Sequence, residues 1–335
     1  MIKYLGSKRT LSPWILDAIQ PLGARSVADV FSGTSRVGHA LKALGYQVFS
    51  NDHNAYAATL ATCYVQADAE DHLADATRLV AEFNALPGRA GFVTETYCER
   101  SRFFQPRNGE RIDAIREAIA AKGLEPELEA IMLTALIEAA DRVDSTTGLQ
   151  MAYLKAWAPR SFRDLELRVP ALLPRATAGK GRVHDLDAEQ FAERVEAEVA
   201  YIDPPYNQHK YIGNYHIWET IVRWDRPEVY GIACKRVDCR TRRSAFNARR
   251  QALAALERVV RALRAKYLVI SFSDEGHVSR EEMEVLLGAQ GTVTTLERDF
   301  KRYVGAQIGI HNPRGARVGT VSHLRNREYL YLVRR

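Results

Sequence analysis

Cysteine is scarce in this chain of 335 residues, and the four cysteines present have no pattern typical of a metal or redox site. Cys63, Cys98, Cys234 and Cys239 form no CxxC pair and have no metal-ligand spacing, so we expect reduced thiols and no metal ion. No apolar run has the length of a membrane span, and no charged-then-apolar leader follows Met1. We therefore expect a cytoplasmic, nucleoid-associated protein without a membrane partner.

The sequence also lacks internal repeats, low-complexity tracts and the complete GxGxxG fingerprint of dinucleotide-binding proteins. Its composition, 46% apolar and 26% charged residues, is ordinary for a globular protein. The length is sufficient to bury the core of one large domain or of two.

Acidic residues are few in the C-terminal third. Residues 235–335 contain 21 basic and 10 acidic residues, a balance of +11, so residues 1–234 carry −5 of the total of +6. The densest basic run is KRVDCRTRRSAFNARR (235–250), which contains one acid. Such a run is often only a solvated face, but its arginine content favours a phosphate-binding surface.

Seven short apolar segments predict strands, and helical patterns separate most of them: 26–31, 46–52, 181–185, 199–203, 266–273, 291–298 and 328–333. Alternation of strand and helix indicates an α/β fold with a doubly wound, mostly parallel sheet. Residues from about 54 to 175 have a helical and more polar pattern, which predicts an insertion between the second and third strands.

The stretch YIDPPYN (201–207) ends the predicted fourth strand in an unusual way. Proline cannot donate to a ladder, so Pro204 ends strand pairing and Pro205 restricts the backbone beyond it. The result is a stiff edge that holds the Asp203 carboxylate and the Tyr206 ring at a strand end, where open α/β sheets bind ligands.

The segment DVFSGTSRVG (29–38) joins a strand to a helix through a turn that contains Gly33. Such a turn brings backbone N–H groups close to a ligand. Asp52 ends the next strand 19 residues later, an offset at which an acid accepts hydrogen bonds from ribose hydroxyls. An ordinary tight turn is the alternative, and the incomplete fingerprint favours a nucleoside without a diphosphate over NAD.

Several blocks together resemble the adenine-N6 DNA methyltransferases of the Dam-like D12 class, α group. They are KYLGSKRTL (3–11), DVFSGT (29–34), SND (50–52), VHDL (183–186) and DPPY (203–206), in the family's order. The blocks 102–116, 139–157 and 214–221 are similar to those of type II restriction-system members. The family often has glycine where Ser35 stands.

The resemblance implies a seven-stranded, Rossmann-like methyltransferase sheet formed by residues 1–55 and 176–335. Residues 56–175 are then a mostly helical target-recognition insertion. The implied cofactor is S-adenosyl-L-methionine, and the residues expected to bind it are Tyr4, Lys8, Phe31, Ser32, Gly33, Thr34, Asp52, Asp185 and Asp203. Asp185 is alternatively a helix N-cap.

The expected reaction is methyl transfer to N6 of an adenine that is flipped out of duplex DNA. The Asp203 carboxylate and the Pro204 carbonyl would accept the amino N–H groups, Tyr206 would stack on the base, and Pro205 would hold this edge rigid. The resemblance further implies a site-specific modification enzyme, which acts on the same DNA site as a cognate restriction endonuclease without necessarily binding it.

The residues expected to contact DNA lie in the insertion, after DPPY and in the basic run. They are Arg100, Arg102, Arg142, Ser145, Thr146, His209, Lys210, Lys235, Arg236, Arg240, Arg242 and Arg243. Trp218, Ile221 and Val222 are expected to pack in the core instead. The target sequence, strand preference and oligomeric state do not follow from the sequence.

Other functions are less compatible with these residues. The acid at position 203 disfavours the related glutamine and cytosine-N4 methyltransferases, which usually have asparagine or serine there. An adenine-N6 RNA methyltransferase and a non-catalytic DNA-binding protein that retains a nucleoside pocket stay open as alternatives. A dehydrogenase is disfavoured by the missing third glycine.

Overall fold

The computed structural model describes residues 1–301, 310–311, 317–319 and 325–335. The α-helices are α1 (Ser12–Ile19), α2 (Arg36–Ala43), α3 (Ala55–Ala61), α4 (Ala69–Ala85), α5 (Pro106–Lys122), α6 (Pro126–Val143), α7 (Ala188–Arg194), α8 (Tyr211–Asn214), α9 (His216–Arg223), α10 (Asp238–Thr241), α11 (Ala252–Ala262) and α12 (Arg280–Gly288). Short 3-10 helices are η1 (Gln20–Leu22), η4 (Pro159–Phe162) and η5 (Ala245–Asn247), and π-helical turns are η2 (Thr62–Gln66) and η3 (Thr94–Glu99).

Within the described residues, seven strands form the central sheet in the order β3-β2-β1-β4-β7-β11-β8. They are β1 (Ser26–Asp29), β2 (Gln47–Asn51), β3 (Arg182–His184), β4 (Val199–Ile202), β7 (Tyr267–Ser273), β8 (Thr292–Lys301) and β11 (Arg325–Arg334). The pairings among β3, β2, β1, β4 and β7 are parallel, and β11 is antiparallel to both of its neighbours. The predicted doubly wound, mostly parallel sheet is confirmed.

Helices cover both faces of the sheet. On one face, α7, α11 and α12 bury apolar side chains such as Phe191, Leu256 and Met283 against the strands. On the other face, α1 and α2 pack Ile15 and Leu41 against the sheet. Because both faces are covered, the central strands are apolar on both sides, and β4 is buried at every position.

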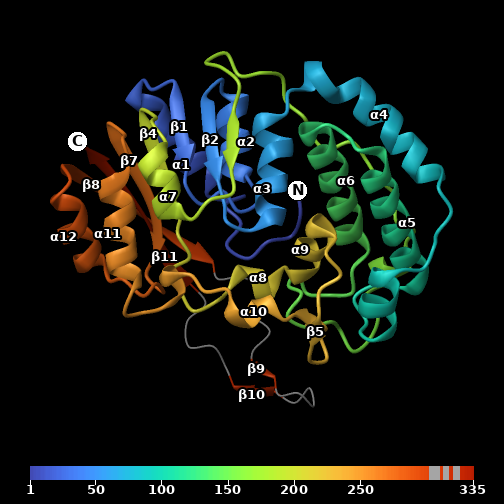
Figure 1. Cartoon of the computed structure of the whole chain (residues 1–335). Coiled ribbons are helices and arrows are strands. Elements are labelled where there is room, and N and C mark those ends of the chain that lie inside the picture. The colour runs from blue at the N-terminus through green and yellow to red at the C-terminus, as the bar shows by residue number, and fades with distance from the viewer. Residues whose placement is uncertain (302–309, 312–316, 320–324) are drawn as a thin grey trace.

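The helices between β2 and β3 form a second apolar cluster beside the sheet (Figure 1). Helix α6 supplies the largest share of it, together with α4 and α5, and α9, which follows DPPY in the sequence, joins them through Ile217, Trp218 and Ile221. The packing predicted for Trp218 and Ile221 is therefore confirmed. Residues 144–181 form little regular structure, apart from η4, on the way back to the sheet.

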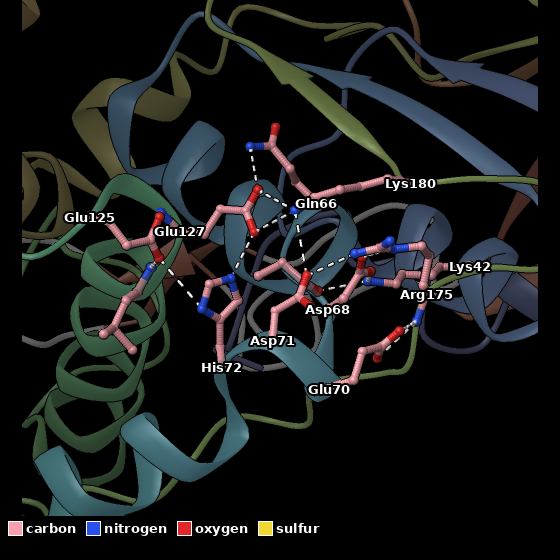
Figure 2. A network of polar contacts seen from close by, with 12 residues as sticks. Lys42, Gln66, Asp68, Glu70, Asp71, His72, Glu125, Glu127, Arg175 and Lys180 are labelled. Carbon is pink, nitrogen blue, oxygen red and sulfur yellow. Dashed lines mark hydrogen bonds and ion pairs between the residues drawn. The ribbon is translucent and has the colours of Figure 1, made fainter.

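A network of ion pairs joins these helices to the sheet layer (Figure 2). Lys42 of α2 lies 2.8 Å from Asp68, and Arg175 lies 2.7 Å from the other oxygen of that carboxylate. Burial alone would raise the pKa of Asp68, but the bonds from Lys42 and Arg175 hold it below its ordinary value. Removing one partner would leave a buried charge unpaired, so the network holds the start of α4 and the segment around Arg175 against α2.

Two smaller two-stranded sheets lie outside the central sheet: β5 (Val229–Tyr230) with β6 (Lys235–Arg236), and β9 (Ile310–His311) with β10 (Arg317–Gly319). The four cysteines are buried and free of disulfides. In the described part of the chain, no helix is long and apolar enough to cross a membrane.

Candidate active site

The strand order reverses between β1 and β4, and a cavity of about 300 Å³ opens at the carboxyl ends of these strands. Strands β1, β2 and β4 each end at this cavity, and the N-terminal loop around Lys8 closes over it. Ligands of open α/β sheets bind at this kind of switch point, because the loops after the two strands diverge there.

The turn after β1 forms one wall of the cavity. Gly33 has a φ of +51°, and a Cβ added there would lie 3.3 Å from the Tyr4 ring, so the position requires glycine. The Gly33 N–H donates to Asp52 Oδ2 at 3.1 Å, and this bond fixes the predicted acid against the turn. Ser35, two residues after Gly33, has a φ of +58°, in the left-handed region that glycine adopts most readily.

Asp29, the last residue of β1, also lines the cavity, and the sequence-based prediction did not include it. Its carboxylate is 1% exposed, and neither oxygen has a hydrogen-bond partner among the described residues. Burial, with smaller contributions from the nearby Asp203 and Asp52 carboxylates, raises its pKa to about 8, and the nearby Gly38 backbone N–H partly opposes this shift. In the sequence, Asp29 stands between an apolar strand and a turn that contains glycine, and this position was the signal that could have identified it as a site residue.

Asp203 lines the cavity opposite this turn, at the carboxyl end of β4. The Lys8 ammonium lies 3.0 Å from Asp203 Oδ1, and the two side chains are only 7% and 17% exposed. Burial raises the pKa of Asp203, and Lys8 partly offsets this effect. Glu328 on β11 is a further buried acid in this region, and burial raises its pKa to about 7. Lys8 was predicted at the site as a cofactor-binding residue, and the structure places its ammonium in the cavity beside Asp203.

Stacked tyrosines form the wall beside the N-terminal loop. The Tyr4 ring stacks on Tyr211 and Tyr215 with centroid distances of 5.2 Å and 4.6 Å, and its hydroxyl lies 3.2 Å from that of Tyr56. Tyr4 and Tyr211 line the cavity. The stack joins the N-terminal block to the segment after DPPY, which lies more than 200 residues away in the sequence.

The remaining DPPY residues lie around Asp203 in different ways. Pro205 lines the cavity, whereas Pro204 is buried and Tyr206 is half-buried, and neither of them lines it. The Tyr206 ring packs edge-to-face on Phe272 at 5.7 Å, and the Lys8 ammonium lies 5.9 Å from its centroid.

Eight of the nine residues predicted to bind the cofactor line the cavity: Tyr4, Lys8, Phe31, Ser32, Gly33, Thr34, Asp52 and Asp203. Asp185 is exposed and does not line it. Asp187, two residues later, lines the cavity instead and caps α7 by accepting the Glu189 N–H at 2.9 Å. The reason is that β3 ends at His184, so the chain turns into the cavity only after Asp185.

Three of the basic residues predicted to contact DNA line the cavity: Lys210, Arg242 and Arg243. Arg242 lies 2.7 Å from the fully buried Glu219 and donates to the His53 carbonyl at 2.9 Å, so its side chain is a fixed part of the wall. Arg243 is exposed at the cavity mouth.

Other predicted DNA contacts lie at the surface or are held within the fold. Residues with exposed or half-buried side chains are Arg100, Arg102, Arg142, His209, Lys235 and Arg240. Arg102 stacks over the Trp157 ring at 4.7 Å, and Arg142 donates to the Glu166 carbonyl at 2.6 Å.

The structure does not bring Ser145, Thr146 and Arg236 to the surface. The Ser145 hydroxyl accepts the Ala158 N–H, the Thr146 hydroxyl donates to the Asp144 carboxylate, and both side chains are buried. Arg236 is buried in ion pairs. These side chains already have partners inside the protein, so we do not retain them in the DNA-contacting set.

The sequence profile of the D12 class N6 adenine-specific DNA methyltransferases matches residues 4–286. The chain belongs to this family. It is therefore an adenine-N6 DNA methyltransferase, an enzyme that uses S-adenosyl-L-methionine and acts on DNA.

Individual proteins similar to this methyltransferase cover most of its length. The type II methyltransferase M.NlaIII of Neisseria lactamica is 27% identical over 90% of this chain and 92% of its own. The type II methyltransferase M.FokI of Planomicrobium okeanokoites is 30% identical over 88% of this chain, which spans only 48% of that longer protein. The crystal structure of TehB from Haemophilus influenzae aligns with 96% of this chain and 62% of the TehB chain, at 10% sequence identity and a TM-score of 0.35. No functional conclusion is drawn from a similarity this low.

The cavity of this D12 methyltransferase fits its cofactor, which carries a sulfonium and an ammonium group. The buried Asp29 carboxylate has no hydrogen-bond partner among the described residues, and Asp52 and Asp203 lie near enough to raise its pKa. A buried carboxylate such as that of Asp29, which has no hydrogen-bond partner among the described residues, favours a positively charged ligand beside it.

Proposed function

We propose that the chain is the modification methyltransferase of a type II restriction-modification system, which methylates N6 of one adenine within a fixed sequence of duplex DNA. The observation that carries the proposal is the position of Asp203 at the carboxyl end of β4, inside the cavity and beside Lys8. The names of its relatives M.NlaIII and M.FokI support the link to restriction systems.

In the proposed reaction, Asp203 acts on the adenine amino group. The lone pair of that nitrogen is delocalised into the ring, so it is a weak nucleophile. The Asp203 carboxylate and the Pro204 carbonyl accept the two N–H groups and concentrate the lone pair on nitrogen. The bound cofactor supplies an electrophilic methyl group on its sulfonium. Transfer of the methyl group from sulfur to nitrogen would leave the cofactor as a neutral thioether and release one amino proton, which the Asp203 carboxylate is placed to accept. The step then requires alignment and no covalent enzyme intermediate.

Lys8 keeps Asp203 in the form that this role requires. Burial raises the pKa of Asp203, and a protonated carboxyl would lose its full acceptor strength. The ammonium 3.0 Å from Oδ1 favours the ionised form. Among the described residues, no hydrogen bond to Oδ2 occurs, so this oxygen remains for the substrate.

The cofactor is proposed to contact the turn at Phe31–Thr34, with Asp52 on its ribose and Asp187 in place of Asp185 near its adenine. Two cations that line the cavity, the exposed Arg243 and the half-buried Lys210, are proposed to hold DNA phosphates. A cytoplasmic location beside the nucleoid, and an endonuclease that shares the site, belong to the same proposal.

The test is methyl transfer from labelled S-adenosyl-L-methionine to unmethylated duplex DNA, with mass spectrometry of the product nucleosides. Wild type should form N6-methyladenine, and Asp203→Ala should lower the rate at least about 10³-fold, as expected for a central electrostatic group. Asp75→Ala is the matched control, because Asp75 is an exposed acid on α4 with a side chain 57% exposed. Methylation of RNA or of dispersed sites would contradict the proposal.

A further inference from the structure

The hairpin of β5 and β6 carries an unusual residue at its tip. Ile232 is 81% exposed, more than any other large apolar side chain in the described part of the chain. Isolated exposed apolar residues are common on protein surfaces, so the exposure of Ile232 alone does not identify a binding surface. The argument depends on how the hairpin is supported and on what lies beside it.

The backbone around the hairpin is held in strained conformations. Among the described residues, non-glycine side chains adopt positive φ at Ser35 in the cavity turn and at Trp224, Arg226 and Cys234, with φ of +51°, +45° and +45°. The last three all lie within the hairpin or the segment that leads to it. Such conformations cost free energy, persist only where surrounding contacts fix them, and cluster at functional sites.

Contacts at the base of the hairpin provide this support. The Arg236 side chain is 4% exposed and donates to both oxygens of Asp225 at 2.6 Å, with Asp238 at 3.1 Å on its other side. The Trp224 indole N–H donates to Glu117 of α5 at 3.0 Å. A base fixed to the helical part of the molecule makes the hairpin a rigid projection.

The hairpin is also joined to the wall of the cavity. After β6 the chain forms α10, where the Cys239 carbonyl accepts from the Lys210 ammonium at 3.5 Å and the Cys239 thiol donates to the Ile212 carbonyl at 3.6 Å. Lys210 and Ile212 both line the cavity. Figure 1 shows β5 close to α10 and α8 at the side of the molecule where the hairpin projects.

Positive charge flanks the apolar tip. The exposed Arg240 guanidinium stacks over the Tyr230 ring at 3.9 Å, so it is held beside the hairpin, and Lys235 follows on β6. An exposed apolar side chain between held cations is complementary to a nucleic acid, whose bases are apolar and whose phosphates are anionic.

We propose that residues 229–236 form a wedge that enters the DNA duplex beside the target adenine. Ile232 contacts the base faces that become exposed when the adenine leaves the stack, and Lys235 and Arg240 hold phosphates on either side. The inference rests on the proposed function, because a wedge is needed only if the base is extruded. A rigid wedge lowers the ordering cost of binding, which explains why the hairpin base is clamped.

The test compares Ile232→Ala with Val285→Ala, a matched control because Val285 is 77% exposed on α12. Both variants are assayed on duplexes that contain the site methylated by wild type, either intact or with an abasic position opposite the adenine. Ile232→Ala should lower kcat/KM on the intact duplex about tenfold and stay within about twofold of wild type on the abasic duplex, where extrusion is easier. Val285→Ala should match wild type on both.

A fluorescent adenine analogue, 2-aminopurine, reports extrusion directly when it replaces the target base. Its fluorescence should rise on binding to wild type and rise less with Ile232→Ala, while Ile232→Leu restores the signal. Equal losses on both duplexes, or no loss on either, would refute the wedge. If wild type itself forms no N6-methyladenine, the proposed function fails first, so the two failures are distinguishable.

Discussion

Replacing Asp29 by asparagine is expected to stabilise the cofactor-free protein at pH 8 and to weaken cofactor binding. Asp29 is buried at the end of β1, and its pKa is raised from 3.8 to about 8. Between these pH values the folded state binds more protons than the unfolded state. Stability must therefore fall as pH rises through this window and level off above about pH 8.

The size of the effect follows from the shift. One pKa unit corresponds to about 1.4 kcal/mol, so the shift of the Asp29 pKa lowers the free energy of unfolding of the wild type by up to about 5 kcal/mol at pH 8. Asparagine does not ionise, but its amide in a site without partners costs about 1–3 kcal/mol. The expected net gain for Asp29→Asn is about 2–4 kcal/mol at pH 8, with no gain near pH 4.

Equilibrium denaturation by urea between pH 4 and 8.5 measures this difference. The wild type should lose stability with rising pH more steeply than Asp29→Asn, and the two curves should cross, with the variant about 1–3 kcal/mol less stable near pH 4. A constant difference across the whole range would refute the argument, because a packing effect carries no pH dependence.

The Asp29 carboxylate, which lowers the stability of the cofactor-free protein, is expected to strengthen cofactor binding. A positive ligand lowers the pKa of Asp29, so binding near pH 7 should release a proton, seen by calorimetry in buffers of different ionisation enthalpy. In Asp29→Asn the proton release should disappear and the Kd should rise about tenfold or more, because a charged hydrogen bond is lost.

Three further outcomes are expected. Lys8→Ala removes the cation that lowers the pKa of Asp203, so the acidic limb of the pH–rate profile should move to higher pH, and an unmoved limb would refute this role. Gly33→Ala places a Cβ 3.3 Å from the Tyr4 ring at a φ of +51°, so cofactor affinity should fall while the urea m-value stays unchanged. Glu219→Ala leaves the partly exposed Arg223 and Arg242 unpaired and the Tyr56 N–H without its acceptor, so it should lower the free energy of unfolding by about 1–3 kcal/mol, and an unchanged free energy of unfolding would contradict the ion-pair argument.

Local chemistry made the sheet and most of the cavity predictable. Each predicted strand ends at a marked change in residue type: a glycine turn after β1, an acid after β2 and two prolines after β4. Parallel strands bring their carboxyl ends to one edge of the sheet, so Gly33, Asp52 and Asp203 had to lie near one another. The packing of the folded protein then determined only the distances between these three residues.

Side-chain direction was not predictable in the same way. Asp185 and Asp187 are both acids after β3, and only the point at which the chain turns into α7 decides which one lines the cavity. Ser145 and Thr146 have the polarity of base-reading residues, but this polarity is used to bond Ala158 and Asp144 inside the fold. Polar residues in irregular segments satisfy buried backbone groups as often as they contact ligands.

The cavity combines features that a stability argument alone would reject. Asp29, Asp52 and Asp203 come from three strand ends, and at the centre of these carboxylates the Asp29 side chain has no hydrogen-bond partner among the described residues. A protein selected for stability would have a neutral residue at position 29, because ionising this buried acid costs free energy. Below its raised pKa of about 8 the Asp29 carboxyl is relieved of the repulsion from the other two carboxylates by protonation, and above it by a cation beside the carboxylates. We propose that the energetic cost of folding with these acids is recovered as affinity for a positively charged cofactor. In the proposed reaction Asp203 must be ionised to accept hydrogen bonds from the adenine amino group, which accounts for the pairing of Lys8 with Asp203 rather than with Asp29.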